Sequence, residues 1–241
     1  RDDAQLNIDQ MMEEMYATTT ASKSACPSPD DYMKSFEGAD NIVVVTITGT
    51  LSGSYNSAEI AKKIYIEEHP DTKIHVIDSL SAGGEVDLLV RKLNHLVAEG
   101  LDFDQVLDAI TAYRAKTKLL FVLAKVDNLV KNGRLSKLVG TVVGLLNIRM
   151  VGEASKTGTL ELLQKARGQK KAIKAAFDEL IKAGYTGGHI TIAHRNNDKF
   201  IEQFSALIRE KFAQASIEVL PTSGLCSFYA EEGGLLMGYE I

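Results

Sequence analysis

The stretch Ile42-Val-Val-Val-Thr-Ile-Thr-Gly-Thr-Leu-Ser-Gly-Ser-Tyr-Asn56 leads from an apolar segment into a turn of small and hydroxyl-bearing residues. Residues 42–47 are mostly β-branched, which is typical of a parallel strand covered on both faces. Residues 58–64 continue with helical spacing, so the turn is expected to open a helix. A helix N-terminus has unpaired N–H groups and partial positive charge, glycines admit a ligand, and hydroxyls add donors. The segment is therefore a candidate site for a phosphate or a carboxylate.

The segments around this turn predict a parallel, doubly wound α/β unit. Residues 73–77 form a second short apolar run that predicts a strand, and helical spacing is visible at 81–99 and 103–116. Two shorter helices are expected upstream, at 9–17 and 31–36. Strands and helices that alternate with short connections indicate a parallel sheet with helices on its faces.

The pattern changes after Thr117, where strands become more frequent. We therefore predict two domains, an N-terminal α/β domain at 1–117 and a C-terminal α+β domain at 118–241 with a roughly six-stranded sheet. A hairpin is expected around Lys156-Thr-Gly158. The expected strands are 119–126, 149–154, 159–167, 189–194, 216–220 and 235–241, residues 127–146 are expected to be helical or mixed, and helices are expected at 169–183 and 199–214.

Composition narrows the functional classes. With 241 residues, 45% of them hydrophobic and 24% charged, the chain is an ordinary globular protein. A net charge of −5 argues against a nucleic acid partner. No apolar run approaches the roughly 20 residues that cross a bilayer and no signal peptide is visible, so we expect a cytoplasmic protein without stable membrane insertion. The two cysteines and five histidines show no metal-ligand spacing, so neither a metal site nor a disulfide framework is expected.

Several other residues have both a functional and a structural interpretation. Ser28 before Pro29 is the pattern of a helix cap. Arg134 follows an Asn-Gly turn, where an arginine is either a solvated surface charge or able to reach an anion. Cys226 could be a nucleophile, but most lone cysteines are buried apolar residues, and His194 is more simply a packed side chain. Neither the Gly-Lys-Ser/Thr sequence of nucleotide hydrolases nor the Gly-x-Ser-x-Gly of serine hydrolases occurs.

In chain order, these segments resemble the DegV family of bacterial fatty-acid-binding proteins. The family motif Ser-Ser-x-Leu-Ser-Gly-Thr-Tyr corresponds to Thr48-Gly-Thr-Leu-Ser-Gly-Ser-Tyr55, and the family loop Thr-Ser-Gln-Pro-Ser to Ser24-Ala-Cys-Pro-Ser28. The family's first strand, with its Asp-Ser segment, has no counterpart in this sequence. Further matches, spanning nearly the whole chain, are Val76-Ile-Asp-Ser79, Lys131-Asn-Gly-Arg-Leu-Ser136, Leu145-Leu-Asn-Ile-Arg149 and Lys165-Ala-Arg167.

The resemblance implies a long-chain fatty acid bound in a cleft between two domains. Its carboxylate would be held by loop hydroxyls and a helix N-terminus. The resemblance assigns this role to Ser24 and to Thr48 with the Gly49 amide, while Ser52 and Gly53 would support the turn. Because Gly49 replaces the family's second serine, one hydroxyl is lost. Family members present the acid to a separate kinase that makes an acyl phosphate. The resemblance thus implies a carrier without catalysis or a cofactor, whose partners are a fatty acid and a fatty acid kinase subunit.

The C-terminal part departs from the family pattern. The motif His-x-Gly-Pro-Gly falls on residues 229–233, so Tyr229 replaces the histidine, and Glu231 and Glu232 are introduced. Arg134 and Tyr229 are candidates for the head-group or phosphate side of the cleft. The alternative is an enzyme acting on a small phosphorylated or acyl substrate in the same cleft. It would use Arg134, with Glu231 or Glu232 as the acid/base. An elongated apolar tunnel favours lipid, whereas a short polar pocket with a carboxylate facing Arg134 favours the enzyme.

Overall fold

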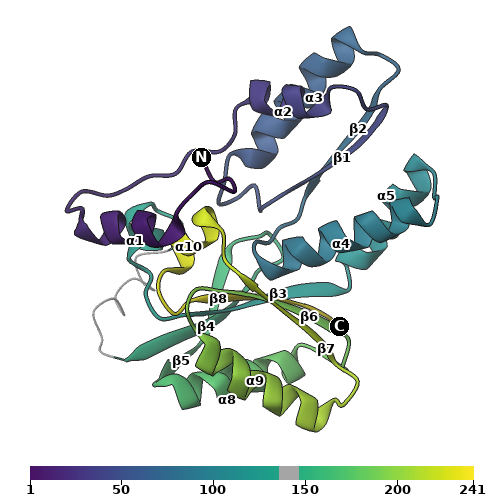
Figure 1. Ribbon diagram of the computed structural model, residues 1–241. Helices are drawn as coiled ribbons and strands as arrows, with labels where there is room; N and C mark the ends of the chain where they lie inside the picture. Colours follow the sequence, from purple (N-terminus) through teal and green to yellow (C-terminus); the bar gives the residue numbers. More distant parts are fainter. Residues whose placement is uncertain (136–146) are drawn as a thin grey trace.

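The computed structural model describes residues 1–135 and 147–241, and within them the chain forms two sheets. One sheet pairs β1 with β2, and the other has the strand order β5-β4-β3-β8-β6-β7 (Figure 1). The elements in chain order are α1 (Ile8–Ala17), α2 (Pro29–Phe36), β1 (Asn41–Thr46), α3 (Ser54–Glu68), β2 (Lys73–Asp78), α4 (Gly84–Ala98), α5 (Phe103–Arg114), β3 (Thr117–Leu123), α6 (Asp127–Lys131), β4 (Ile148–Ala154), β5 (Leu160–Arg167), α8 (Gln169–Lys182), β6 (His189–His194), α9 (Asp198–Lys211), β7 (Ser216–Pro221), α10 (Gly224–Ala230) and β8 (Leu235–Glu240).

Strand β1 is covered on both faces, as its β-branched sequence predicts. It runs parallel to β2. Its side chains alternate, so Ile42 and Val44 pack with α2 and α3, whereas Val43 and Val45 pack with α4 and α5. This arrangement confirms the prediction of a parallel α/β unit with helices on both faces.

The six-stranded sheet also has two apolar faces. On β3, Leu120 and Val122 face the core formed with α8 and α9, whereas Leu119, Phe121 and Leu123 face the opposite side. Strands β3, β4, β5 and β8 pair antiparallel, β6 also pairs antiparallel with β8, and β6 pairs parallel with β7. The predicted six-stranded α+β sheet is thereby confirmed.

Helix α4 lies between the two sheets (Figure 1). Leu89 and Leu93 pack under β1 and β2. At its other end Gly84 lies so close to β8 that a Cβ there would be 2.7 Å from the Gly238 nitrogen. The molecule is thus layered, with α2 and α3, then β1 and β2, then α4 and α5, then the large sheet, then α8 and α9.

The structure corrects the predicted elements in a few places. Helix α10 was not predicted, and α4 begins at Gly84 rather than at residue 81. The prediction for 127–146 is met by α6 over Asp127–Lys131, while residues 136–146 lie outside the described residues. Among the helices described, none has the length and apolar character needed to cross a membrane.

Candidate functional site

The β1 turn, residues 47–53, is held by hydrogen bonds to the end of β2 and to the loop that follows it. The Thr48 N–H donates to the Ser81 carbonyl at 2.8 Å, and the Thr48 side chain is buried. The Gly49 N–H donates to both carboxylate oxygens of Asp78, at 3.1 and 3.2 Å. The amide assigned to a ligand carboxylate is therefore engaged by Asp78 in this arrangement. Sequence reasoning missed this role of Asp78, although its position at the end of the neighbouring parallel strand was the available signal.

Helix α3 begins directly after this turn without an acidic residue at its N-terminus. Gly53 is the N-cap and supplies no side-chain hydrogen bond, and the first helical turn carries no Asp or Glu. The hydroxyl oxygens of Ser52 and Ser54 are 3.0 Å apart, and the Ser52 hydroxyl accepts a hydrogen bond from the Ser54 N–H at 3.2 Å, so no charged group is added at this end of the helix. The partial positive charge of a 15-residue helix is thus left for an external anion.

The loop that contains Ser24 lies beside the start of α3. The Ser57 hydroxyl donates to the Pro27 carbonyl at 2.7 Å, and a Cβ at Gly53 would lie 3.0 Å from the Cys26 sulfur. A side chain at Gly53 would therefore crowd the Cys26 side chain. The predicted cap is confirmed, because Ser28 caps α2, whose first residue is Pro29. The two segments of the predicted head-group site are thereby brought together.

Ser24, Arg134 and Tyr229 meet on the other side of this loop. The hydroxyls of Ser24 and Tyr229 share a hydrogen bond of 2.8 Å across 205 sequence positions. The Arg134 guanidinium lies 5.2 Å from the centre of the Tyr229 ring, and its Nε donates to the Leu51 carbonyl at 3.1 Å. Arg134 is therefore a bridge from α10 to the β1 turn rather than a solvated charge. The sequence marked each residue separately but did not predict their contact.

The glutamates of the alternative enzyme have other partners. Glu231 is buried, accepts a hydrogen bond from the Asn128 N–H at 3.1 Å, and burial raises the pKa of its carboxyl. Glu232 pairs with Arg195, whose Nε is 3.5 Å away. Over residues 1–135 and 147–241, neither carboxylate forms an ion pair with Arg134. The acid/base arrangement proposed for an enzyme is thus not assembled around Arg134.

Apolar side chains adjoin Tyr229 and form a continuous cluster on the large sheet, which we call the sheet-face cluster. Cys226 belongs to its edge, and burial raises the pKa of its thiol to about 11, as suits a packed residue rather than a nucleophile. The other members of the cluster are Leu119, Phe121, Leu123, Val126, Leu129, Val130, Leu135, Ile148, Met150, Ala154, Leu160, Leu162, Ala230 and Leu236. The Tyr229 ring thus joins the polar end of the site to an apolar cluster.

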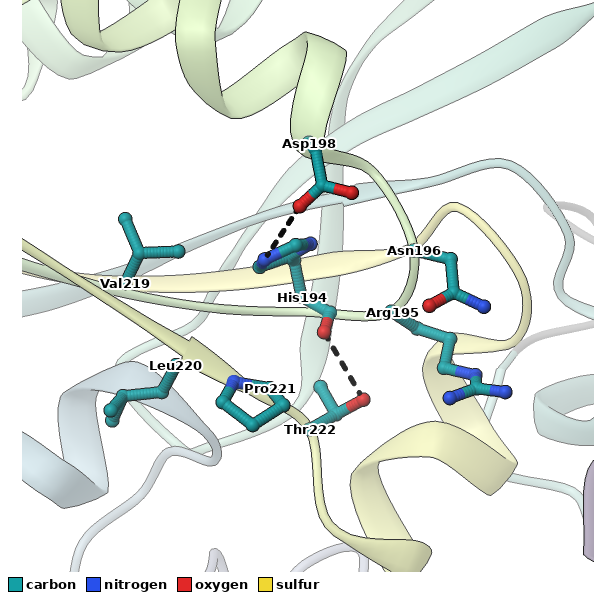
Figure 2. Close-up of a pocket in the computed structure, with 8 residues that line it drawn as sticks. All are labelled: His194, Arg195, Asn196, Asp198, Val219, Leu220, Pro221 and Thr222. Carbon is teal, nitrogen blue, oxygen red and sulfur yellow. Dashed lines mark hydrogen bonds and ion pairs between the residues drawn. The ribbon is translucent and has the colours of Figure 1, made fainter. Parts of the chain in front are cut away.

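A cavity of about 260 Å³ lies at the carboxyl ends of β6 and β7 (Figure 2). Figure 2 shows His194 pointing toward Asp198, with its backbone carbonyl facing Thr222. His194 Nδ1 accepts a hydrogen bond from the Asn197 N–H at 3.1 Å. The ring is therefore held within the fold, in agreement with its interpretation as a packed residue. In the described part of the chain, no group of three His, Cys, Asp or Glu side chains converges as a metal site.

Comparison with known proteins agrees with this architecture. The family model described as "Uncharacterised protein, DegV family" matches residues 1–239. The chain belongs to the DegV family. Its structure resembles that of the Streptococcus pneumoniae Fatty Acid Kinase (Fak) B3 protein loaded with linoleic acid, at 77% identity and a TM-score of 0.98, over 100% of this chain and 85% of that one.

Two more distant DegV family structures have the same fold. The protein from Eubacterium eligens loaded with heptadecanoic acid is 39% identical, with a TM-score of 0.96 over 99% of this chain and 87% of that one. The protein from Ruminococcus gnavus, refined with vaccenic acid, is 33% identical, with a TM-score of 0.90 over 99% of this chain and 86% of that one. The predicted family and its two-sheet architecture are therefore confirmed.

Proposed function

We propose that this protein binds a long-chain fatty acid between an N-terminal domain at 1–117 and a C-terminal domain at 118–241. The observation that carries the proposal is the similarity, at 77% identity over the whole chain, to a protein loaded with linoleic acid. The site supports it, because the uncompensated N-terminus of α3 suits a carboxylate and the sheet-face cluster suits an acyl chain.

Each predicted residue has a role in this proposal. Ser24 and Thr48 supply hydroxyl donors to the carboxylate, while Ser52 and Gly53 shape the turn and keep it narrow. The Gly49 N–H donates to the Asp78 carboxylate, so without ligand Gly49 shapes the turn. It would contact the ligand only if the fatty acid carboxylate displaced Asp78. The acyl chain gains about 0.8 kcal/mol for each CH₂ it buries, so tight binding requires no catalysis.

The protein acts as a carrier in the cytoplasm, presents the acid to a fatty acid kinase and is not itself an enzyme. Arg134 and Tyr229 form the head-group side from which a kinase would reach the carboxylate. The absence of an ion pair between Arg134 and Glu231 or Glu232 in the described residues favours the carrier over the enzyme.

Lipid extraction tests the binding proposal. The purified protein should release a long-chain fatty acid identifiable by mass spectrometry, and delipidated protein should bind linoleic acid saturably. A sample without lipid that also fails to bind the acid in titration would contradict the proposal.

Presentation is tested separately with a fatty acid kinase and ATP. The loaded protein should allow acyl phosphate to form, which hydroxylamine traps as a measurable hydroxamate. If free linoleic acid reacts equally fast without the protein, binding stands but presentation is wrong. The variant Tyr229→His restores the family residue and is expected to increase the yield.

A further inference from the structure

Asp78, the last residue of β2, places its carboxylate against two backbone amides. The Gly49 N–H donates to its two oxygens at 3.1 and 3.2 Å, and the Leu80 N–H donates to its Oδ1 at 3.0 Å. Gly49 lies in the β1 turn and Leu80 in the loop after β2, so the two amides converge from different segments. The β1 turn therefore already binds a carboxylate, and that carboxylate belongs to the chain itself.

The backbone is shaped around this carboxylate. Leu80 has a φ of +55°, a conformation that residues with a side chain rarely adopt. A Cβ at Gly49 would lie 2.9 Å from Asp78 Oδ2, so the close approach depends on a glycine. Arg114 donates to the backbone carbonyl of Asp78, and within residues 1–135 and 147–241 no Lys, Arg or His side chain forms an ion pair with its carboxylate. The negative charge of Asp78 is thus held by backbone N–H dipoles and is not paired with a cation.

We propose that Asp78 is a specificity-determining residue of the head-group site, because its carboxylate competes with that of the fatty acid for the Gly49 N–H. This inference rests on the proposed function, which places the acid beside Thr48 and Gly49. One N–H has a single proton to donate, and two carboxylates at neighbouring positions repel each other. Asp78 therefore lowers the affinity for the charged acid and leaves the affinity for an uncharged ligand with the same chain unchanged. When the acid leaves, the amide returns to Asp78, so release leaves no donor unpaired.

The test compares the binding of linoleic acid and of linoleyl alcohol, which has the same chain and no carboxylate, to delipidated protein at neutral pH. Asp78→Asn keeps an oxygen for the two amides and removes the charge. The affinity for the acid should rise about fivefold while the affinity for the alcohol changes little, so the acid/alcohol ratio rises by a similar factor. Asp102→Asn is the matched control, because the Asp102 carboxylate also accepts a backbone N–H, that of Gln105 at 2.9 Å, but lies at the far end of α4 from the loop that contacts Thr48. Its ratio should remain that of the wild type.

Asp78→Ser provides a second variant if Asp78→Asn fails to fold. A serine hydroxyl can still accept the Leu80 N–H two positions further on, and it carries no charge, so the acid/alcohol ratio should again rise. A ratio in Asp78→Asn that equals that of Asp102→Asn, or falls below it, would overturn the inference. A loss of affinity shared by acid and alcohol, or a failure of both variants to fold, would make Asp78 a purely structural residue and would overturn it equally. Failure of the proposed function is distinguished from these outcomes, because wild-type protein would then bind neither ligand.

Discussion

The β1 turn and the β6 turn, residues 195–197, occupy the same place in two strand–helix–strand units, yet the helices that follow them begin differently. Strands β1 and β2 are parallel around α3, as β6 and β7 are around α9. Helix α9 carries Asp198 in its first turn, whereas α3 carries no acidic residue there. The chain thus supplies its own carboxylate to one helix N-terminus and leaves the other for a ligand.

The backbone of the β6 turn is also occupied by the chain itself. The Arg195 N–H donates to the Gly234 carbonyl and the Gly233 N–H to the Arg195 carbonyl, each at 2.9 Å. The Asn197 side-chain amide donates to Gly233 at 2.7 Å. The Thr48 and Gly49 N–H groups of the β1 turn are likewise engaged within the chain. The two units therefore differ in the charge at the start of the helix and not in the turn backbone, so equivalent topology does not make equivalent sites.

The largest expected effect on fatty acid affinity comes from Thr48→Val, which removes a hydroxyl from the β1 turn. We expect fatty acid affinity to fall by about 1–3 kcal/mol, since a charged head group loses a hydroxyl donor. Thr222→Val in the second unit is the matched control, because Thr222 is equally buried and its hydroxyl bonds Ser227 at 2.7 Å. Calorimetric titration should show the loss only in Thr48→Val. Unchanged affinity in that variant would show that Thr48 does not contact the carboxylate.

A smaller effect is expected from Tyr229→Phe. The variant removes the hydrogen bond to Ser24 but keeps the ring against Arg134, so both unfolding free energy and fatty acid affinity should fall by about 1 kcal/mol. In the control Tyr185→Phe, the hydroxyl that donates to the Gly188 carbonyl at 2.7 Å is lost far from the site. Urea unfolding should show a loss in both variants, and titration a loss in Tyr229→Phe alone. If Tyr229→Phe and Tyr185→Phe lost equal affinity, Tyr229 would have no specific role at the head-group side.

Local patterns predicted much of this architecture. Strand β6 was expected at the residues where it is found, His189–His194, and the cap at Ser28 follows from the residues next to it. The alternation of Ile42–Val45 between two cores follows from the pleat of a strand. These features depend on neighbours within a few positions, so a single sequence contains them.

The remaining features depend on residues far apart in the chain. The N-cap residue of helix α10 makes no side-chain hydrogen bond. Instead, the carboxylate of Asp2 accepts hydrogen bonds from the N–H groups of Gly224 and Leu225, at 2.8 and 2.7 Å. The bond between Ser24 and Tyr229 likewise joins opposite ends of the chain. Periodicity and capping rules are local, so they identify such residues as candidates without placing them together.

A charge exchange between the two helix N-termini sharpens the comparison. Asn56→Asp puts a carboxylate into the first turn of α3, where it should stabilise the fold by about 0.3–1 kcal/mol and weaken fatty acid binding by a similar amount. Asp198→Asn, at a side chain that is 94% exposed, should lower stability by about 0.3–1 kcal/mol without changing affinity. Both effects should shrink as salt is added. If Asn56→Asp stabilises the fold but leaves affinity intact, the N-terminus of α3 is not the carboxylate site.

The smallest expected effect concerns Glu231, which lies beside the glycines that hold the β6 turn. Its pKa is raised by burial, so between the ordinary carboxyl pKa and the raised one the folded protein binds more protons than the unfolded chain. Its contribution to stability is therefore present at acidic pH and declines as pH rises through that window. Glu231→Gln keeps an oxygen for the Asn128 N–H but cannot ionise. Denaturant unfolding at a series of pH values should show the decline flattened in this variant.

The exposed Glu13 of α1 is the control for the same substitution, because Glu13→Gln removes a carboxyl without any burial. Fatty acid affinity should be unaffected by Glu231→Gln, since the carboxylate serves α6 and the neighbouring turn rather than the N-terminus of α3. If Glu231→Gln instead raised the affinity, the buried carboxylate would have to lie near the ligand's own charge. The two strand–helix–strand units would then share one electrostatic site, and the contrast drawn between them would be wrong.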